Sequence, residues 1–202
     1  MNYPDYSIED RLITEGYRYV VGVDEVGRGP GAGPVVASAV YVPPEVMPDL
    51  YLRVRDSKKL SERKREILYD EITSKCSYGI GIIDNKKIDE INILQATILA
   101  MTIAINKLPN VDYIIVDGTV RLDKLGLPYY PIVRGDNLSI SIASASIVAK
   151  VTRDEIMRTL HWVYPQYSWM HNKGYLTSEH IEAIKTYGPT EYHRLSFKKV
   201  GD

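Results

Sequence analysis

The sequence predicts an α/β fold that ends in a helical C-terminal region. Three strand-like segments come first, helices and strands then alternate, and helices alone follow, which is the order expected when helices cover a sheet. The chain has 202 residues, of which 45% are hydrophobic and 25% are charged, so its length and composition suit one globular unit with a substantial core. No internal repeat or low-complexity linker divides it.

Five segments have the pattern of strands. The first two are continuous apolar runs on either side of a glycine-rich turn at residues 27–33, and Pro43 closes the second. In the third, Ile80 and Ile82 alternate with other residues, and the fourth ends in a turn at Gly118. The expected strands are residues 19–23, 34–42, 77–83, 112–117 and 129–133.

Capping residues mark where the helices begin. The segments SIED (7–10) and NILQ (92–95) have capping-box spacing, and Ser61 and Thr177 are N-cap residues before apolar positions at helical intervals. Small and apolar residues recur with helical period from residue 139 onward. A loop rich in aromatic residues is expected at 164–175. The expected helices are residues 7–16, 61–75, 92–105, 139–163 and 177–188.

Composition excludes several classes of protein. The single cysteine, Cys76, excludes an internal disulfide and a thiolate zinc site, and it suits a reducing compartment. No charged leader precedes an apolar run, and the longest apolar stretch, residues 94–105, is too short to cross a bilayer. We therefore expect a cytoplasmic protein that does not enter a membrane.

One segment is basic although the chain as a whole is not. The net charge is −1, but residues 53–65 contain seven basic and two acidic side chains. Phosphates respond to the local field, so this segment could contact nucleic acid, and a solvated helix face explains it equally well.

An acidic pair, Asp24 and Glu25, directly follows the first expected strand. Strand neighbours point to opposite faces, so the two carboxylates can share a site only if the strand breaks, and Gly27 and Gly29 allow that break. These glycines also permit a sugar or phosphate to approach the backbone, with Arg28 available for an anion. The alternative is an exposed acidic pair before an ordinary turn.

Two further aspartates follow apolar strands. Asp117 ends the fourth strand and Asp136 comes just after the fifth, although Asp136 could instead cap the following helix. Open α/β sheets place ligands beyond the carboxyl ends of their strands. Crowded carboxylates repel one another unless cations neutralise them, and oxygen ligands suit Mg²⁺ or Mn²⁺. The four carboxylates are therefore interpreted as a two-metal site for phosphodiester hydrolysis.

A series of motifs resembles the ribonuclease HII family in the family's order over roughly residues 9–197. The joint match is specific, whereas no single motif is. The motifs are DEVGRGPGAGPV (24–35), DSKKL (56–60), VDG (116–118), GD (135–136), SIASASIVAKVTRD (141–154), KGY (173–175), GP (188–189) and HRLSF (193–197).

The resemblance implies a ribonuclease H-like five-stranded mixed sheet flanked by helices. It implies a catalytic domain at residues 1–163 and a C-terminal substrate-binding loop and helix at 164–202, packed on the same domain. The implied activity is endonucleolytic hydrolysis of RNA in RNA–DNA hybrids, including incision on the 5′ side of single ribonucleotides in duplex DNA. The implied products have 3′-hydroxyl and 5′-phosphate ends.

The resemblance also assigns roles to individual residues. Mg²⁺ or Mn²⁺ would be bound by the catalytic carboxylates. Substrate would be bound by the glycine-rich loop that senses ribose 2′-hydroxyls, by a lysine on phosphate and by a tyrosine stacked on the sugar at an RNA–DNA junction. The catalytic carboxylates are Asp24, Glu25, Asp117 and Asp136. The loop residues are Gly27, Arg28 and Gly29, the lysine is Lys58, and the tyrosine is Tyr175. No terminal motif for a sliding-clamp partner is present at 196–202, so we expect a monomer without an obligate protein partner.

The chain departs from the family pattern at two positions. Gly31 stands where leucine is usual, which puts the rigidity of the loop in doubt, and Asn172 stands where histidine is frequent, so no role is assigned there. Among the histidines, which are expected to be structural or solvated, His193 could lie with Arg194 over the substrate groove. Asp154 could orient a lysine of the site such as Lys150.

Two other functions compete. A nucleotide-binding α/β enzyme would use residues 27–33 as its phosphate loop, but Ala32 takes the place of the third glycine and the run after Gly33 looks like a strand. A non-catalytic nucleic-acid binder of the same fold is disfavoured, because a protein that only binds phosphates gains nothing from four clustered carboxylates.

Overall fold

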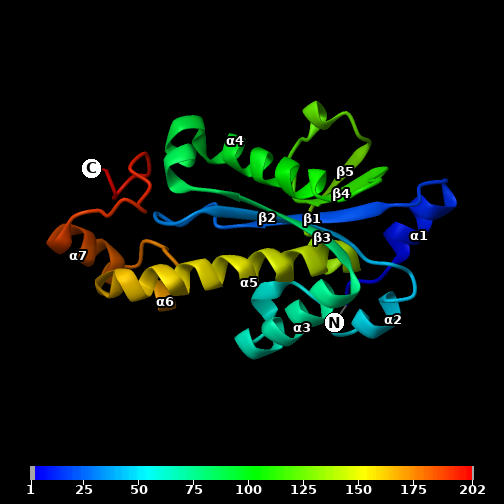
Figure 1. The fold of residues 1–202 in the computed structure, drawn as a ribbon, viewed down its shortest axis with the longest axis horizontal. Helices are drawn as coiled ribbons and strands as arrows, with labels where there is room; N and C mark the ends of the chain where they lie inside the picture. The colour runs from blue at the N-terminus through cyan, green and yellow to red at the C-terminus, as the bar shows by residue number, and fades with distance from the viewer. Residues whose placement is uncertain (1–2, 202) are drawn as a thin grey trace.

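The computed structural model describes residues 3–201, and its centre is a mixed five-stranded sheet with helices on both faces (Figure 1). The strands are β1 (Val20–Val26), β2 (Val35–Tyr41), β3 (Ser77–Ile83), β4 (Tyr113–Asp117) and β5 (Tyr129–Ile132). They lie in the order β3-β2-β1-β4-β5; β1 pairs antiparallel with β2 and parallel with β4, and β4 pairs parallel with β5. The carboxyl ends of β1, β4 and β5 therefore meet at one edge of the sheet.

The helices divide between the two faces of the sheet. They are α1 (Ser7–Thr14), α2 (Met47–Leu50), α3 (Glu62–Lys75), α4 (Asn85–Asn106), α5 (Ile140–Val163), α6 (Trp169–Asn172) and α7 (Ser178–Tyr187). Figure 1 shows α4 above the sheet and α5 below it, with α3 beyond α5.

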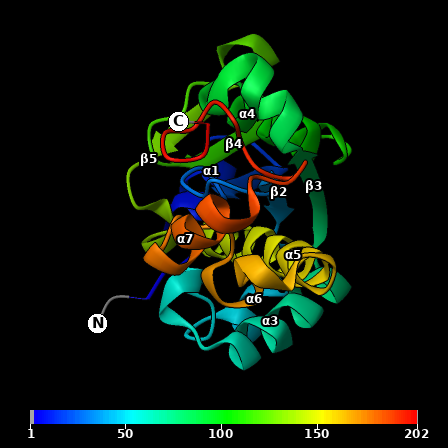
Figure 2. The same ribbon diagram turned by 90° about the vertical axis from the view of Figure 1, so that its left-hand side faces the viewer.

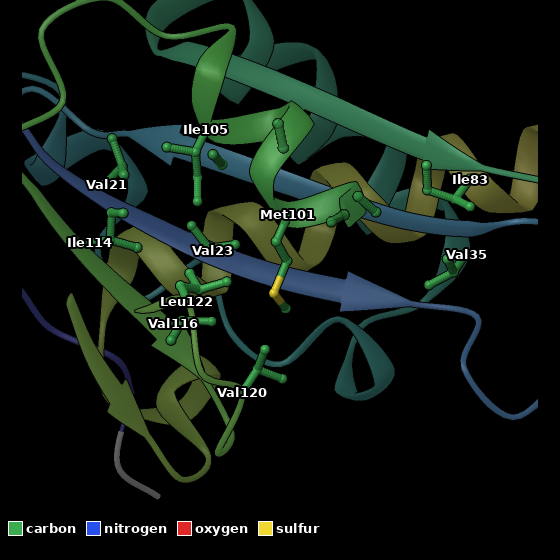
Figure 3. Packing of buried hydrophobic residues seen from close by; sticks show 14 of the residues in the cluster. Val21, Val23, Val35, Ile83, Met101, Ile105, Ile114, Val116, Val120 and Leu122 are labelled. Atoms are coloured by element: carbon green, nitrogen blue, oxygen red, sulfur yellow. The ribbon is translucent and has the colours of Figure 1, made fainter. Parts of the chain in front are cut away.

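Helix α4 packs so closely on β3 that two glycines are required. A Cβ atom at Gly79 would lie 2.0 Å from the carbonyl oxygen of Ala104, and one at Gly81 would lie 1.9 Å from that of Ala100. The main core fills the remaining space between this helix and the sheet, where Met101 and Ile105 meet the valines of β1 (Figure 3).

Helix α5 packs on the other face with small residues toward the sheet. Residues 140–149 are all buried, and a Cβ atom at Gly22 of β1 would lie 2.2 Å from the carbonyl carbon of Ser141. This contact fixes the start of α5 against the middle of the sheet. The helix that follows Asp136 in the sequence is thus held in place by direct backbone packing.

The C-terminal segment forms a separate small core at one end of the sheet. Trp169 and Tyr167 are buried there with Met157 of α5 and Ala32 of the loop between β1 and β2. Figure 2 shows α6 and α7 gathered at this end, with α6 beside the end of α5 and α7 above it, toward α4. The division into residues 1–163 and 164–202 stays a prediction, with residues 1, 2 and 202 outside the described part of the chain.

Three element boundaries differ from the sequence prediction. The capping box at Ser7 is wrong, because Ser7 is already helical and its N–H donates to Asp5 Oδ1 at 3.0 Å. Strand β1 continues to Val26, so the acidic pair lies within the strand and the break begins at Gly27, with φ +96°. Helix α4 begins seven residues earlier than expected, where Asp84 accepts a hydrogen bond from the N–H of Lys87.

Helix α4 also differs in character from the apolar segment expected at 94–105. It is the one helix of the described chain that is long and apolar enough to span a membrane, but part of its surface is buried on the sheet. Asn92 interrupts it with φ +66° and accepts hydrogen bonds from the N–H groups of Leu94 and Gln95. The NILQ cap is therefore confirmed, although it lies inside a longer helix. Helix α4 is thus a helix of the core that packs on the sheet.

Candidate active site

The four predicted carboxylates come from segments that end at the same edge of the sheet. Asp24 and Glu25 are near the end of β1, Asp117 is the last residue of β4, and Asp136 lies in a 3₁₀ turn (Gly135–Asn137) just after β5. Because β1, β4 and β5 are parallel, their carboxyl ends bring these residues to one side.

The pair on β1 carries charge that the protein does not neutralise. Asp24 is 7% exposed, and burial together with the charges of Glu25 and Asp117 raises its pKa well above the usual value for aspartate. Burial also raises the pKa of Glu25, while Arg28, whose Nη1 lies 3.4 Å from Glu25 Oε1, lowers it in part. Arg28 therefore offsets only part of the negative charge of this pair.

The two aspartates beyond β1 are each held by a neighbour. The N–H of Gly135 donates to Asp117 Oδ1 at 2.6 Å, and Asn137 Nδ2 donates to Asp136 Oδ1 at 2.6 Å. Burial raises the pKa of Asp136, and the charges of Asp117 and Asp56 add to this effect. Helix α5 is capped by Ser139, which accepts from the N–H of Ile142, so the alternative that Asp136 caps this helix is wrong.

The carboxylates share an edge without converging at ligand distance. Among residues 3–201, no three Asp, Glu, His or Cys side chains come together closely enough to hold a metal ion. Regular pairing of β1 through Val26 sends neighbouring side chains to opposite faces, and like charges repel. The donor set nevertheless fits a hard divalent cation, because it consists of carboxylate oxygens, and burial together with neighbouring negative charge raises the pKa values of Asp24 and Asp136.

Lys58 faces this edge from a 3₁₀ turn (Ser57–Lys59). Its side chain is exposed, and its charge opposes in part the rise in the pKa values of Glu25 and Asp136 that burial causes. The turn is held by Arg65, whose Nη1 donates to the carbonyls of Ser57 and Leu60 at 3.1 and 2.6 Å. The sequence alone assigned no role to Arg65. This residue belongs to the basic run, but its side chain is largely buried and holds the turn.

Asp154 supports this lysine turn. The ion pair expected with Lys150 is present, with Lys150 Nζ donating to Asp154 Oδ1 at 2.6 Å. Asp154 Oδ2 also lies 3.9 Å from Arg65, which grips the turn of Lys58. In addition, Ser57 and Ser146 share a hydrogen bond of 3.0 Å between their hydroxyls. Asp154 therefore acts on the turn of Lys58 as well as on Lys150.

The glycine-rich loop lies next to Tyr175. Arg28 and Gly29 are exposed, whereas Gly27 and residues 30–34 are buried. A Cβ atom at Gly29 would lie 3.3 Å from Cε1 of Tyr175, whose side chain is itself exposed. A flat, half-exposed ring therefore stands beside the most accessible part of the loop.

Asn172 and two histidines hold the turn of Tyr175. Asn172 Oδ1 accepts from the N–H of Gly174 at 2.8 Å, and its Nδ2 donates to the carbonyl of Tyr167. His180 Nδ1 donates to the carbonyl of Tyr175 at 2.9 Å, and His180 Nε2 lies 3.1 Å from His193 Nε2. Burial lowers the pKa of both histidines, that of His193 to about 4, which favours the uncharged form of each ring. Asn172, which stands where histidine is frequent in the family, thus has a structural role.

Comparison with known proteins decides the family. The family model described as ribonuclease HII matches residues 21–200. The chain belongs to the ribonuclease HII family. A ribonuclease HII from Ruminiclostridium cellulolyticum is 52% identical over 195 residues, covering 96% of this chain and 75% of that protein. Family membership makes the chain an endoribonuclease that hydrolyses RNA in RNA–DNA hybrids.

Solved structures of related proteins share the fold. A ribonuclease HII from Archaeoglobus fulgidus, solved in complex with PCNA, matches with TM-score 0.76 and 24% identity over 90% of this chain and 96% of that one. Bst-RNase HIII in complex with Mn²⁺ matches with TM-score 0.70 and 18% identity, over 92% of this chain and 69% of that one. The five-stranded mixed sheet is therefore ribonuclease H-like, as expected.

The structure also bears on the remaining interpretations. The segment after Gly33 is strand β2, which excludes the dinucleotide fingerprint that opens a helix. His193 and Arg194 are 1% and 0% exposed, so they do not lie over a substrate groove. Gly31 is fixed on both sides, because its N–H donates to the carbonyl of Gly174 and its carbonyl accepts from the N–H of Arg194. Leu176 fills the space beside it, 2.7 Å from where a Cβ would be.

Proposed function

We propose that this member of the ribonuclease HII family incises duplex DNA on the 5′ side of a single ribonucleotide, in addition to cutting longer hybrids. The products would carry 3′-hydroxyl and 5′-phosphate ends. The observation that supports this most is the placement of the exposed Arg28–Gly29 segment against the ring of Tyr175. One backbone segment and one ring offer enough contacts for a lone 2′-hydroxyl and the sugar that follows it.

We propose Asp24, Glu25, Asp117 and Asp136 as the catalytic residues that hold Mg²⁺ or Mn²⁺. The support is chemical: all four offer carboxylate oxygens, and burial and repulsion leave negative charge that a cation would offset. The Mn²⁺ complex of the related Bst-RNase HIII agrees with this choice of metal. In two-metal hydrolysis the bound ions would supply an activated water and stabilise the leaving 3′-oxygen.

The side chains around the carboxylates would bind and orient the duplex. Lys58 is exposed beside the acidic edge and would contact a phosphate, while Gly27, Arg28 and Gly29 would approach the ribose. Tyr175 would stack on the sugar at the junction. Because phosphate and sugar contacts carry no base information, cleavage should depend little on base sequence.

The test compares a DNA duplex containing one ribonucleotide with an all-DNA duplex and a long hybrid. We expect incision 5′ of the ribonucleotide, no cutting of the all-DNA duplex, and digestion of the hybrid. Tyr175→Ala should lower the rate on the single-ribonucleotide duplex roughly tenfold more than the rate on the hybrid, since one stacking contact is worth ~1–3 kcal/mol. Tyr187→Ala, an exposed tyrosine of α7, is the control.

A wild-type enzyme that digests long hybrids but ignores the single-ribonucleotide duplex would refute the finer proposal. It would leave the family activity intact, because digestion of hybrids needs only the acidic edge and phosphate contacts.

Partner and compartment remain part of the proposal. We propose that the chain acts as a monomer in the cytoplasm without an obligate protein partner. The free buried thiol of Cys76 suits a reducing compartment. Because the Archaeoglobus fulgidus protein is described in complex with PCNA, cleavage rates should be measured with and without an added sliding clamp. Full activity of the purified chain alone is expected.

A further inference from the structure

Two arginines that are fully buried hold the glycine-rich loop from beneath. Arg153 of α5 and Arg194 of the C-terminal segment are each 0% exposed. Arg194 donates from Nε to the carbonyl of Gly33 at 2.9 Å, from Nη1 to that of Arg28 at 3.2 Å and from Nη2 to that of Gly27 at 2.7 Å. One guanidinium therefore fixes both ends of the loop.

Arg153 joins the same loop to the turn of Tyr175. It donates from Nε to the carbonyl of Pro34 at 2.9 Å, from Nη2 to that of Ala32 at 3.1 Å and from Nη1 to that of Lys173 at 2.9 Å. The N–H of Gly31 donates to the carbonyl of Gly174 beside this link. Arg153 is thus the side chain that bonds to both the loop and the turn of Tyr175, beside one backbone hydrogen bond.

Neither arginine is used as an ordinary ion-pair partner. In the described part of the chain, no carboxylate forms a salt bridge with either guanidinium, and all six hydrogen bonds that these two side chains donate go to backbone carbonyls. Burying a guanidinium without a counter-ion is costly, and burial lowers the pKa of Arg153 to about 10 and that of Arg194 to about 9. The planar guanidinium spreads its five N–H donors over three nitrogens, so it can bind three carbonyls that lie apart, whereas the donors of an ammonium all leave one nitrogen.

This arrangement determines which backbone groups of the loop remain available. The arginines and neighbouring amides occupy the carbonyls of residues 27, 28 and 31–34. Within residues 3–201, by contrast, the N–H groups of Arg28 and Gly29 have no protein acceptor. The accessible tip of the loop therefore offers donors, which suit a hydroxyl oxygen.

We infer that Arg153 and Arg194 are positioning residues for ribonucleotide recognition: they hold the loop carbonyls inward so that the N–H groups at its tip stay free beside Tyr175. Arg194 sets the conformation of the loop itself, and Arg153 sets its distance from the tyrosine. This inference rests on the proposed function, because it assigns the origin of the discrimination for a single ribonucleotide.

Lysine substitutions test the inference most directly. Arg153→Lys and Arg194→Lys keep the positive charge but replace the fork with a single ammonium, which cannot bind three separated carbonyls in this geometry. Arg158→Lys is the matched control, since Arg158 is on the same helix but pairs with Glu62 and Glu155 at the surface. Melting temperature and the circular dichroism spectrum establish the folded fraction of each variant.

The first measurement is the ratio of kcat/KM on the single-ribonucleotide duplex to that on the long hybrid. We expect this ratio to fall about tenfold in Arg153→Lys, because the loop and the tyrosine separate. Arg194→Lys should raise KM on both ribonucleotide substrates. A loss of active fraction lowers kcat on both substrates equally and leaves the ratio and KM unchanged, so unchanged values in folded variants would overturn the inference.

The second measurement is amide hydrogen exchange over residues 27–34. Faster exchange confined to this loop in both lysine variants supports the holding role, and wild-type exchange rates in both would refute it. If the wild-type enzyme ignores single ribonucleotides, the proposed function fails together with the specificity role, and hydrogen exchange alone then decides whether the arginines hold the loop.

Discussion

The acidic edge and the glycine-rich loop are adjacent in sequence but are built in opposite ways. At the acidic edge, buried carboxylates lie near one another with few protein cations, and burial raises the pKa values of Asp24 and Glu25. In the loop, the neutral carbonyls of residues 32–34 each receive a hydrogen bond from a buried guanidinium. The buried guanidinium groups of Arg153 and Arg194 thus bind the uncharged loop and not the carboxylates of the acidic edge.

This difference separates two tasks of a nuclease. A site that must bind cations keeps unbalanced negative charge, which destabilises the free protein and is relieved when the ligand arrives. A segment that must recognise one hydroxyl is held rigid before the substrate arrives, so that little conformational entropy is lost on binding. The acidic edge should therefore respond strongly to metal and pH, and the loop should not.

Removing divalent cations should have the largest effect, because all four carboxylates of the acidic edge are proposed to act through them. Cleavage of a long hybrid is expected to stop in excess chelator and to return with Mg²⁺ or Mn²⁺. Ca²⁺ should bind without supporting turnover, because its looser coordination aligns water and phosphate poorly. Initial rates over a titration of each metal provide the measurement, and full activity in chelator would eliminate the metal site.

Single carboxylate substitutions should break the acidic edge almost as completely. Asp24→Asn and Asp117→Asn are expected to lower kcat by about a thousandfold or more while the circular dichroism spectrum is unchanged. Asp70→Asn on the exposed face of α3 is the control and should retain wild-type kcat. Turnover close to wild type in either variant would remove that residue from the catalytic set.

Lys58→Ala should have an intermediate effect, on binding rather than on chemistry. We expect KM on a long hybrid to rise roughly fivefold to tenfold, and the slope of log K against log salt to fall by about one phosphate contact. Lys124→Ala, an exposed lysine on another turn, should change neither quantity. An unchanged salt dependence in Lys58→Ala would show that this lysine does not contact phosphate.

Thermal stability should show the smallest effect, with a sign that depends on pH. The pKa of Asp24 is raised in the folded protein, so this carboxyl lowers the free energy of unfolding above its unfolded pKa, near 3.8, and stops doing so as the pH falls through that value. In chelator, Asp24→Asn should therefore raise the Tm by a few degrees at pH 8 and by almost nothing at pH 3.5. A gain that is equal at both pH values would exclude charge repulsion as its cause.

The sequence predicted the features that depend on local pattern. All five strands were located, and Ser61, Ser139 and Thr177 lie at the starts of their helices as expected. The end of β1 was misjudged because regular pairing with β2 carries the strand through the charged pair. The early start of α4 was missed because its first turns contain few apolar residues.

The supports of the candidate site were not predictable in the same way. Arg153 and Arg194 contact loop carbonyls that are 119 to 167 positions away in sequence, and no periodicity or spacing reveals such a contact. The sequence motif around each arginine resembles the family, but a motif gives a position and not a partner. The role of Asp136 was open in the same way, because the sequence allowed it to be either a site carboxylate or the cap of the following helix. Only the observed cap at Ser139 excludes the second interpretation.

The single thiol offers a way to follow the folded state of every variant with one reagent. Cys76 is buried against the α3 and α5 side of the sheet, and burial raises its pKa to about 12, so neither access nor ionisation favours modification while the chain is folded. Alkylation should therefore proceed only through opening of the core, at one site per molecule. The labelling rate then reports how often that core opens, independently of any substrate, metal or loop conformation.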